Sequence, residues 1–339
     1  TDANGCTAQT FITLTEPPAL NVDTIYSTEY FGGWNISCNG GDNGSVFSAA
    51  SGGAQPYSWY WSNDDTTQNI TNVSVTIYIV TVTDINGCTA QDSILLDEPT
   101  LLVTNIAAQT NVDCYGNSTG SVTIAASGST PPYRYSLDGV NYQSSPVFSG
   151  LSAGSYNVSV LDTNGCGMIM GVTIQEPTAP LTSSLGPVVN VNCYSEATGS
   201  GQVSVTGGSQ PYTFSLNNGT PVQDSSFTGL TAGNYSVLVT DANGCSSTVT
   251  FSITENPQLN GTPSSTAANC SQNNGTASVV ASGGVGPYNY SWNPGGGSTD
   301  IITGLSAGTY DVTITDNLGC TATATTSVGT TPPLNAVVS

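Results

Sequence analysis

A short block of sequence recurs along the chain and ends each time in Gly-Cys. Complete copies occupy residues 73–88, 151–166, 230–245 and 305–320, and the tail of a fifth copy ends at Cys6. Successive copies lie roughly 80 residues apart, which is too long for one coil of a solenoid and matches a small domain. The period therefore predicts a row of repeated domains within the 339 residues.

Proline-containing segments separate the copies of this block. Glu-Pro, Glu-Asn-Pro or Thr-Pro follows each copy after one strand's length. Proline cannot donate to a strand ladder and restricts the residue before it, so these segments suit domain boundaries. The predicted divisions are the end of a preceding module at 1–18, repeats 1 to 4 at 19–99, 100–177, 178–257 and 258–333, and the start of a following module at 334–339.

The composition of the repeats indicates strands and turns, because Thr, Val, Ser, Gly and Tyr dominate and helix formers are sparse. Trp59 and Trp61 alternate with polar residues, so we expect both to face a core rather than a bound sugar. The Leu-x-Ala-Gly-x-Tyr lead-in resembles the tyrosine corner of immunoglobulin-like sandwiches. The prediction is an all-β tandem array of immunoglobulin-like β-sandwich modules, about seven strands each. Thr76 replaces a glycine of the other repeats, so its corner should differ or be strained.

Nine cysteines make four pairs and one left over. One cysteine opens each repeat and one closes it, which predicts one disulfide per module. The predicted pairs are Cys38–Cys88, Cys114–Cys166, Cys193–Cys245 and Cys270–Cys320, with Cys6 unpaired. Closing a loop of about 50 residues would stabilise a repeat by about 4 kcal/mol. Disulfides indicate an extracellular setting, and the absence of His and of Cys-x-x-Cys disfavours a metal site for these cysteines.

The charge balance excludes several classes of function. The formal charge is −21, with Arg134 as the only basic side chain and no His. Nucleic acid and anionic lipid both require clustered Lys and Arg, so neither partner is expected. No apolar run is long enough for a membrane span. Without His, and without a distinctive pair of carboxylates, we expect no catalytic residue and no enzyme activity.

The Asp-x-Asn-Gly motif before most of the closing cysteines allows two interpretations. Its oxygens suit calcium, which makes candidate ligands of Asp84, Asn86, Asp162, Asn164, Asp241 and Asn243. Two or three ligands per copy are too few for a closed site, however. The same residues favour a tight hairpin turn, which is the preferred interpretation. Calcium is the only cofactor, besides covalent glycans, that the sequence suggests.

The combination Gly-Leu-x-Ala-Gly-x-Tyr…Asp-x-Asn-Gly-Cys resembles the SprB-type repeat of very large surface adhesins in gliding and other Bacteroidetes. It is clearest at residues 150–166, 229–245 and 304–320, and weakest in repeat 1. The resemblance implies a secreted, cell-surface protein that projects from the cell as a filament and has no catalytic residues. We expect the chain to be a section of a longer array that contacts other copies of itself or further repeats.

The expected function is structural: an extracellular fibril or adhesin stalk that carries glycans. The alternative is an adhesive module whose variable loops, such as 62–72 and 293–300, bind a surface glycan or another ligand with calcium. A third class, accessory repeats of an enzyme, would need a catalytic domain elsewhere.

Two kinds of acceptor site support the glycosylation. Asn-x-Ser/Thr sequons, which arise readily by chance in such a chain, occur at Asn35, Asn43, Asn69, Asn72, Asn117, Asn157, Asn218, Asn234, Asn274 and Asn289. The Asp-Ser/Thr-aliphatic pattern of O-linked acceptors in Bacteroidetes is resembled at Thr24, Thr66 and Ser93. Asn157 and Asn234 should be exposed, because they lie on the strand face opposite its Tyr and Val residues.

Overall fold

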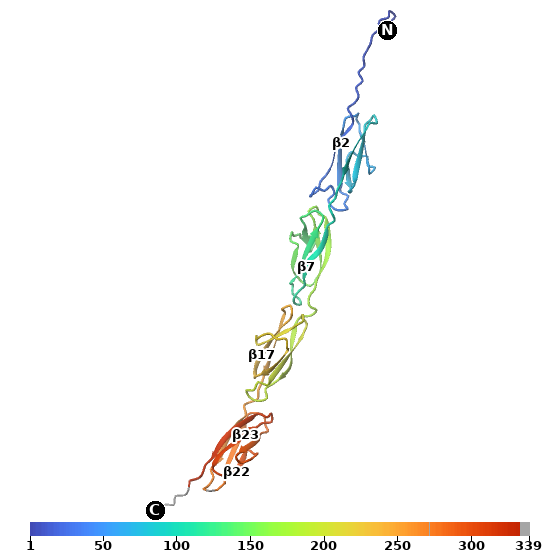
Figure 1. The fold of residues 1–339 in the computed structure, drawn as a ribbon. Coiled ribbons are helices and arrows are strands. Elements are labelled where there is room, and N and C mark those ends of the chain that lie inside the picture. Colours follow the sequence, from blue (N-terminus) through green and yellow to red (C-terminus); the bar gives the residue numbers. More distant parts are fainter. Residues whose placement is uncertain (271, 333–339) are drawn as a thin grey trace, which may run out of the picture. The chain divides into compact units, whose positions relative to one another are not determined.

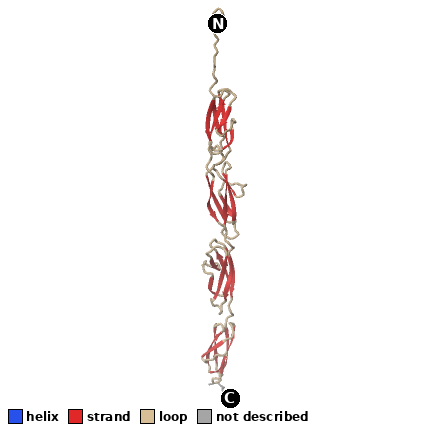
Figure 2. Cartoon of the chain, turned by 90° about the vertical axis from the view of Figure 1, so that its right-hand side faces the viewer, coloured by secondary structure: helices blue, strands red, loops and turns tan. Residues whose placement is uncertain are grey.

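The computed structural model describes residues 1–270 and 272–332 (Figures 1 and 2). Over these residues the structure contains strands β1 to β24 and no helix. The predicted all-β fold class is therefore confirmed. In the same ranges no helix exists that is long and apolar enough to cross a membrane. The predicted start of a following module at 334–339 lies outside the described residues.

Each repeat contains six strands. Those of repeat 1 are β1 (Asn21–Ser27), β2 (Gly44–Ser51), β3 (Ser58–Trp61), β4 (Ile70–Val73), β5 (Ile77–Thr83) and β6 (Thr89–Leu95). Those of repeat 2 are β7 (Val103–Thr110), β8 (Gly120–Ser127), β9 (Arg134–Ser136), β10 (Val147–Leu151), β11 (Gly154–Leu161) and β12 (Gly167–Ile174). Those of repeat 3 are β13 (Thr182–Val189), β14 (Gly199–Thr206), β15 (Thr213–Leu216), β16 (Ser226–Leu230), β17 (Gly233–Thr240) and β18 (Ser246–Ile253). Those of repeat 4 are β19 (Asn260–Thr266), β20 (Gly275–Ser282), β21 (Asn289–Asn293), β22 (Ile301–Leu305), β23 (Gly308–Thr315) and β24 (Thr321–Val328).

The six strands of a repeat form two antiparallel sheets of three. In repeat 1 the sheets have the orders β1-β2-β4 and β3-β5-β6, and the other repeats follow the same plan. The apolar core lies between the two sheets, where Val46 from β2 packs with Trp61 from β3 and Val80 from β5. Trp61 is fully buried and Trp59 packs partly buried against the same core. Both tryptophans thus face the core, as predicted.

The predicted count of about seven strands per repeat is not confirmed, because the structure assigns six to each repeat over the described residues. A seven-stranded immunoglobulin-like sandwich has a fourth strand next to the one that corresponds to β4. Here the segment between β3 and β4 forms a loop with its own hydrogen bonds. The indole Nε1 of Trp61 donates to the Thr67 carbonyl at 2.8 Å, and the Thr67 amide donates to Asp65 Oδ1 at 2.8 Å. Hydrogen bonds within this loop therefore replace the backbone hydrogen-bond ladder that a further strand would form.

The tyrosine corner predicted from the sequence is present. In each repeat a tyrosine hydroxyl donates to the backbone carbonyl four residues upstream: Tyr78 to Ser74, Tyr156 to Ser152, Tyr235 to Thr231 and Tyr310 to Ser306, at 2.9–3.2 Å. Thr76 is not strained, because its backbone does not enter the positive-φ region. The corner does not require a positive φ, because Gly233 and Gly308, the counterparts of Thr76 in repeats 3 and 4, also lie outside that region.

Contacts divide the chain into two compact units, which we describe separately. The first consists of residues 1–112 and 116–176, and the second of residues 113–115 and 177–339. The first unit thus holds repeats 1 and 2, and the second holds repeats 3 and 4. The short segment 113–115 belongs to repeat 2 in sequence but groups with the second unit. The disulfide between Cys114 and Cys245 explains this grouping.

Candidate functional site

The disulfides join successive repeats instead of closing loops within them. Cys38 bonds to Cys166, Cys114 to Cys245 and Cys193 to Cys320, with Cα–Cα distances of 5.6, 5.7 and 5.5 Å. The cysteine that opens one repeat is thus bonded to the cysteine that closes the next. Cys88 and Cys270 are free and exposed, and so is Cys6. The predicted pairs Cys38–Cys88, Cys114–Cys166, Cys193–Cys245 and Cys270–Cys320 are therefore wrong.

The fold explains why the two cysteines of one repeat do not pair. Cys88 directly precedes β6, whereas Cys38 lies beside Glu98 beyond the far end of that strand, since the Gly40 amide donates to Glu98 Oε2 at 2.6 Å. Ten extended residues span roughly 33 Å, far beyond the Cα separation of about 4.4–6.8 Å that a disulfide allows. The opening turn and the closing hairpin therefore occupy opposite ends of the sandwich.

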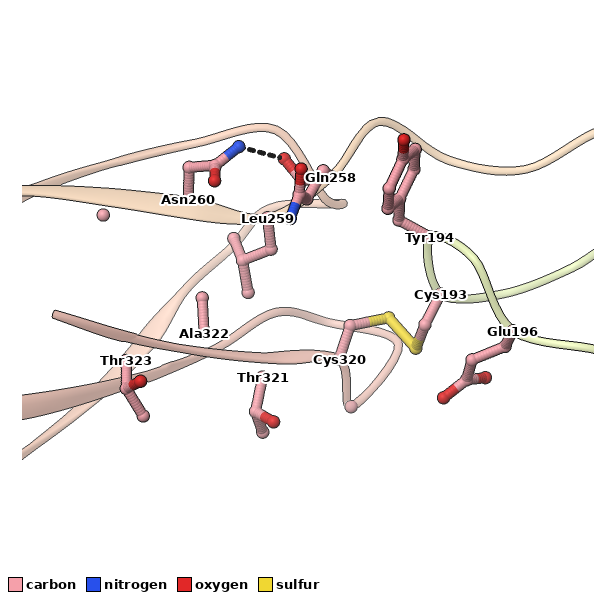
Figure 3. Close-up of a pocket in the computed structure, with 12 residues that line it drawn as sticks. Cys193, Tyr194, Glu196, Gln258, Leu259, Asn260, Cys320, Thr321, Ala322 and Thr323 are labelled. Carbon is pink, nitrogen blue, oxygen red and sulfur yellow. Dashed lines mark hydrogen bonds between the residues drawn. A yellow bond between two sulfur atoms is a disulfide. The ribbon is translucent and has the colours of Figure 1, made fainter.

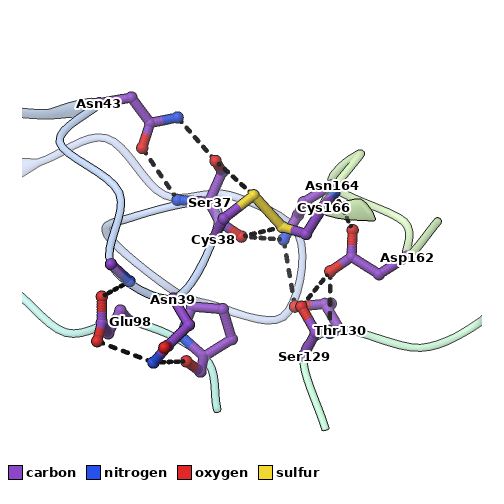
Figure 4. The surroundings of a disulfide bond; sticks show 12 residues. Ser37, Cys38, Asn39, Asn43, Glu98, Ser129, Thr130, Asp162, Asn164 and Cys166 are labelled. Carbon is purple, nitrogen blue, oxygen red and sulfur yellow. Dashed lines mark hydrogen bonds between the residues drawn. A yellow bond between two sulfur atoms is a disulfide. The ribbon is translucent and has the colours of Figure 1, made fainter. Parts of the chain in front are cut away.

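The junction in the first unit joins the opening turn of repeat 1 to the β11–β12 hairpin of repeat 2 (Figure 4). Beside the disulfide, the Asn164 amide donates to the Phe31 carbonyl at 3.0 Å, and the Phe31 amide donates to Asn164 Oδ1 at 3.2 Å. Cys166 is buried and its sulfur lies 3.1 Å from the Ser37 carbonyl oxygen. Covalent and polar contacts together hold these two repeats against each other.

A glutamate fixes the opening turn that carries each bonded cysteine. Oε2 of Glu98, Glu176 and Glu255 accepts a backbone N–H of the turn at 2.6 Å, from Gly40, Gly116 and Ser195 respectively. These are the glutamates of the Glu-Pro and Glu-Asn-Pro segments, which the sequence analysis used only as boundary markers. Their recurrence at one place in each repeat was the available signal of a structural role. Repeat 4 has Thr330 at this position.

The second unit contains two junctions of the same kind. At Cys193–Cys320, a hollow of about 470 Å³ lies beside the disulfide and is lined by Tyr194, Glu196 and Leu259, among others (Figure 3). At Cys114–Cys245, the Asn243 amide donates to the Asp113 carbonyl at 2.9 Å. The hairpin of repeat 4 has Leu318 where the others have asparagine, so this side-chain amide contact cannot form there.

The hairpin aspartates that were candidate calcium ligands are buried acceptors of backbone hydrogen bonds. Oδ1 of Asp84 accepts the amides of Asn86 and Cys88 at 2.9 Å, and Oδ2 accepts the Ala54 amide at 2.9 Å. Asp241 makes the matching three bonds, and Asp162 binds Cys166, Thr130 and Ser129. Asn164 and Asn243 face the neighbouring opening turn, while Asn86 is exposed. Among the described residues no group of three or more His, Cys, Asp or Glu could hold a metal. This geometry favours turn formation over calcium binding.

Backbone hydrogen bonds of this kind lower the pKa of two hairpin carboxyls, Asp84 and its counterpart in repeat 4, Asp316. The amide of Ala54, followed by those of the hairpin, holds the pKa of Asp84 below its ordinary value. For Asp316, burial alone would raise the pKa, but the amides of Val285, Cys320, Leu318 and Gly319 outweigh burial and lower it. Both carboxyls are therefore ionised when the hairpins are folded at neutral pH.

Acid should weaken the repeats through these carboxyls. Because the folded pKa values lie below the unfolded value of about 3.9, the stabilisation is complete above that pH and is lost as the pH falls through the folded values. The melting temperature measured by calorimetry between pH 7 and pH 2 should therefore drop below about pH 4. Acid also relieves the self-repulsion of the −21 chain, so wild type is compared with Asp84→Asn. The variant should have a lower melting temperature than wild type at pH 7, and its melting temperature should fall less on acidification. An equal fall in both proteins would contradict the assignment.

The glycosylation candidates are exposed with one exception. Asn35 is half-buried and its amide donates to the Ser27 hydroxyl. The exposed candidates are Asn43, Asn69, Asn72, Asn117, Asn157, Asn218, Asn234, Asn274, Asn289, Thr24, Thr66 and Ser93. The predicted exposure of Asn157 and Asn234 is confirmed. Nδ2 of Asn43 donates to Ser37 Oγ at 2.7 Å, so a glycan there would have to break a bond of the opening turn.

The family model described as the SprB repeat matches four segments in tandem, residues 35–66, 106–141, 185–221 and 262–297. Each segment contains one opening cysteine and reaches the third strand of its repeat. The SprB repeat model thus matches once within each of the four repeats that the structure shows. The Leu-x-Ala-Gly-x-Tyr block that suggested the family lies outside the matched segments.

Several solved structures are similar to this chain, while none of the curated proteins matches it. One is the N-terminal eight Ig domains of Down syndrome cell adhesion molecule, with 11% identity and a TM-score of 0.28 over 93% of this chain. Another is invasin, a bacterial integrin-binding protein, with 12% identity and a TM-score of 0.35, covering 90% of this chain and 79% of that one. A tetra-tandem repeat from a large adhesion protein has 15% identity and a TM-score of 0.22, covering 91% and 98%. The chain spans 61% of the length of the first structure.

Proposed function

We propose that this chain is an extracellular structural array, part of a fibril or adhesin stalk on the cell surface. The observation that carries the proposal is the interlacing of the disulfides. Cys114 lies inside the loop closed by Cys38–Cys166, and Cys193 lies inside the loop closed by Cys114–Cys245. Disulfides persist in oxidising settings outside the cytoplasm. Covalent bonds from each repeat to the next fit a role in bearing tension better than they fit a set of freely hinged binding domains.

The proposal is tested on intact cells of the source organism. Antibodies against repeats 2 and 3, detected with gold particles in the electron microscope, should label extracellular fibrils without permeabilisation. Deletion of the gene should remove both label and fibrils, and a strain that regains the gene should regain them. Labelling that appears only after the cells are opened would refute the extracellular assignment. Intact fibrils in the deletion strain would refute the structural role.

Covalent glycans and a binding role are finer parts of the proposal. Most of the acceptor candidates are exposed on a surface rich in hydroxyl and amide groups, which supports glycosylation. An intact mass equal to that of the bare polypeptide would refute glycosylation. For the alternative of a glycan-binding module, exposed Tyr60 beside the 62–72 loop is the supporting feature, because its ring could stack on a sugar. Retention on a glycan array that disappears in Tyr60→Ala and on calcium removal would favour this alternative.

A further inference from the structure

We propose that the Cys88 end of repeat 1 is a docking face for the cysteine-bearing opening turn of another SprB repeat, and that a disulfide from Cys88 closes the contact. The inference deepens the proposed structural function, on which it rests, by naming the partner of a face that is free in the described chain. Three further copies of this face occur in repeats 2, 3 and 4, and each of them holds such a turn.

The hairpin of Cys88 already has the shape of the bonded hairpins. Asp84 accepts the amides of Asn86 and Cys88, as Asp241 accepts those of Asn243 and Cys245, all at 2.9 Å. The difference lies in exposure. The bonded cysteines Cys166, Cys245 and Cys320 are 8–9% exposed, whereas Cys88 is exposed. The thiol is thus held in its bonding position without the partner that covers its counterparts.

A hollow beside Cys88 corresponds to the hollows at the occupied faces. It measures about 380 Å³ and is lined by Leu20, Gly53, Cys88 and Thr89, among others. The equivalent hollow in repeat 3 is lined by Leu181, Gly208, Cys245 and Ser246, and here Tyr115 of the bonded opening turn forms a further wall. In repeat 4, Tyr194 does the same (Figure 3). The free hollow therefore has the receiving residues of the site and lacks the residues of the turn.

Asn86 completes the resemblance. Its counterparts Asn164 and Asn243 donate their side-chain amides to the carbonyl of the residue before the docked cysteine, Ser37 at 3.4 Å and Asp113 at 2.9 Å. The Asn86 side chain is exposed, and within the described ranges its side-chain amide group forms no hydrogen bond. Its removal should therefore leave repeat 1 folded and weaken only the docked state, which makes it a suitable probe.

An opening turn with an unbonded cysteine exists in repeat 4, where Thr330 takes the place of the glutamate that fixes the bonded turns. Cys270 is exposed, and its sulfur lies 3.2 Å from the Thr331 carbonyl oxygen. The Ala268 amide donates to the Gly329 carbonyl at 2.8 Å, as the Val191 amide donates to the Thr254 carbonyl at 2.9 Å before the bonded Cys193. Repeat 4 of a second copy can thus serve as the docking partner in a test with the purified chain.

The bond requires an oxidant, for which we name a low-molecular-weight disulfide such as oxidised glutathione. The Cys88 thiolate attacks this disulfide, forms a mixed disulfide and releases one glutathione thiolate. The Cys270 thiolate then attacks the Cys88 sulfur and releases the second glutathione thiolate. Two protein thiols are oxidised to one disulfide, and the reagent is reduced to two glutathione thiols, which take up the two protons that the protein thiols lose.

The test uses the full chain with Cys6→Ser, which removes the third free thiol. The protein is kept concentrated in a glutathione redox buffer, with added salt to screen the repulsion between two copies of charge −21. Pepsin then cuts the unreduced product in acid, because trypsin has only Arg134 to cut at. We expect Cys88–Cys270 linked peptides to exceed the symmetric Cys88–Cys88 and Cys270–Cys270 peptides by tenfold or more. A random mixture of the three, or thiols that stay free, would overturn the proposal.

Asn86→Ala in the same background is the matched variant, since it keeps both thiols. Loss of about one hydrogen bond, worth about 1 kcal/mol, should slow formation of the mixed pair about fivefold. An unchanged rate would show that chance collision forms the bond. In native material, Cys88 should be linked to an opening-turn cysteine of an SprB repeat; a free or glutathione-capped Cys88 would refute the docking face. These outcomes are independent of surface labelling, so the docking face can fail while the proposed function stands.

Discussion

A single oxidised chain pulled by its two ends should reach a full length about 900 Å shorter than the same chain in reductant. The Cys38–Cys166 and Cys193–Cys320 bonds bridge sequence separations of 128 and 127 residues. At roughly 3.5 Å per extended residue, these two loops hide about 900 Å of backbone from the pulling force. Optical tweezers with handles on both termini measure this limit directly. Reductant added during the experiment should release the hidden length.

The Cys114–Cys245 pair supplies the control. The shortest covalent path through the chain crosses the other two bonds and does not use this one. Replacing both Cys114 and Cys245 by Ser should therefore leave the length limit of the oxidised chain unchanged. If the disulfides closed loops within the repeats instead, the oxidised chain would be only about 700 Å shorter than the reduced chain. The double replacement would then lengthen the oxidised chain by about half of that difference.

Asp162→Ala should lower the local stability of the β11–β12 hairpin by about 2–4 kcal/mol. Asp162 is fully buried, and its carboxylate accepts hydrogen bonds from Cys166, Thr130 and Ser129. Removing the acceptor leaves buried amides without a partner, which costs more than an ordinary hydrogen bond yields. Amide hydrogen exchange in the hairpin should accelerate about 30- to 1,000-fold.

Two variants bracket this result. Asp162→Asn keeps the shape and one acceptor oxygen, so its exchange should fall between that of wild type and that of the alanine variant. Asp224→Ala, at an exposed loop position where the carboxylate accepts the Ser226 amide, should leave exchange in the hairpins unchanged. Wild-type exchange in Asp162→Ala would show that the carboxylate does not hold the hairpin.

The repeat, the strand composition and the tyrosine corner could be predicted because each is a local pattern. The hydroxyl of Tyr156 reaches a carbonyl only four residues away, so the sequence alone contains both partners of the bond. The loop in place of a seventh strand could not be predicted in the same way. It depends on Trp61 and Asp65 satisfying the segment locally, which alternation of apolar residues does not reveal.

The disulfide pairing could not be predicted because a periodic chain offers two equally regular choices. The closing cysteine of the same repeat lies about 50 residues from Cys38, and that of the next repeat lies 128 residues away. Only the fold shows that Cys38 and Cys88 occupy opposite ends of the sandwich. Asn164 illustrates the same limit: its motif predicts a turn, but its bond to Phe31 requires two repeats to meet.

The interlacing of the three disulfides also bears on damage by proteases. Every peptide bond between Cys38 and Cys320 lies inside at least one disulfide loop, and those between Cys114 and Cys166 or between Cys193 and Cys245 lie inside two. A single cut anywhere in that range therefore leaves both fragments covalently attached. A protease outside the cell would have to cut at least twice within this range before any part of it is shed.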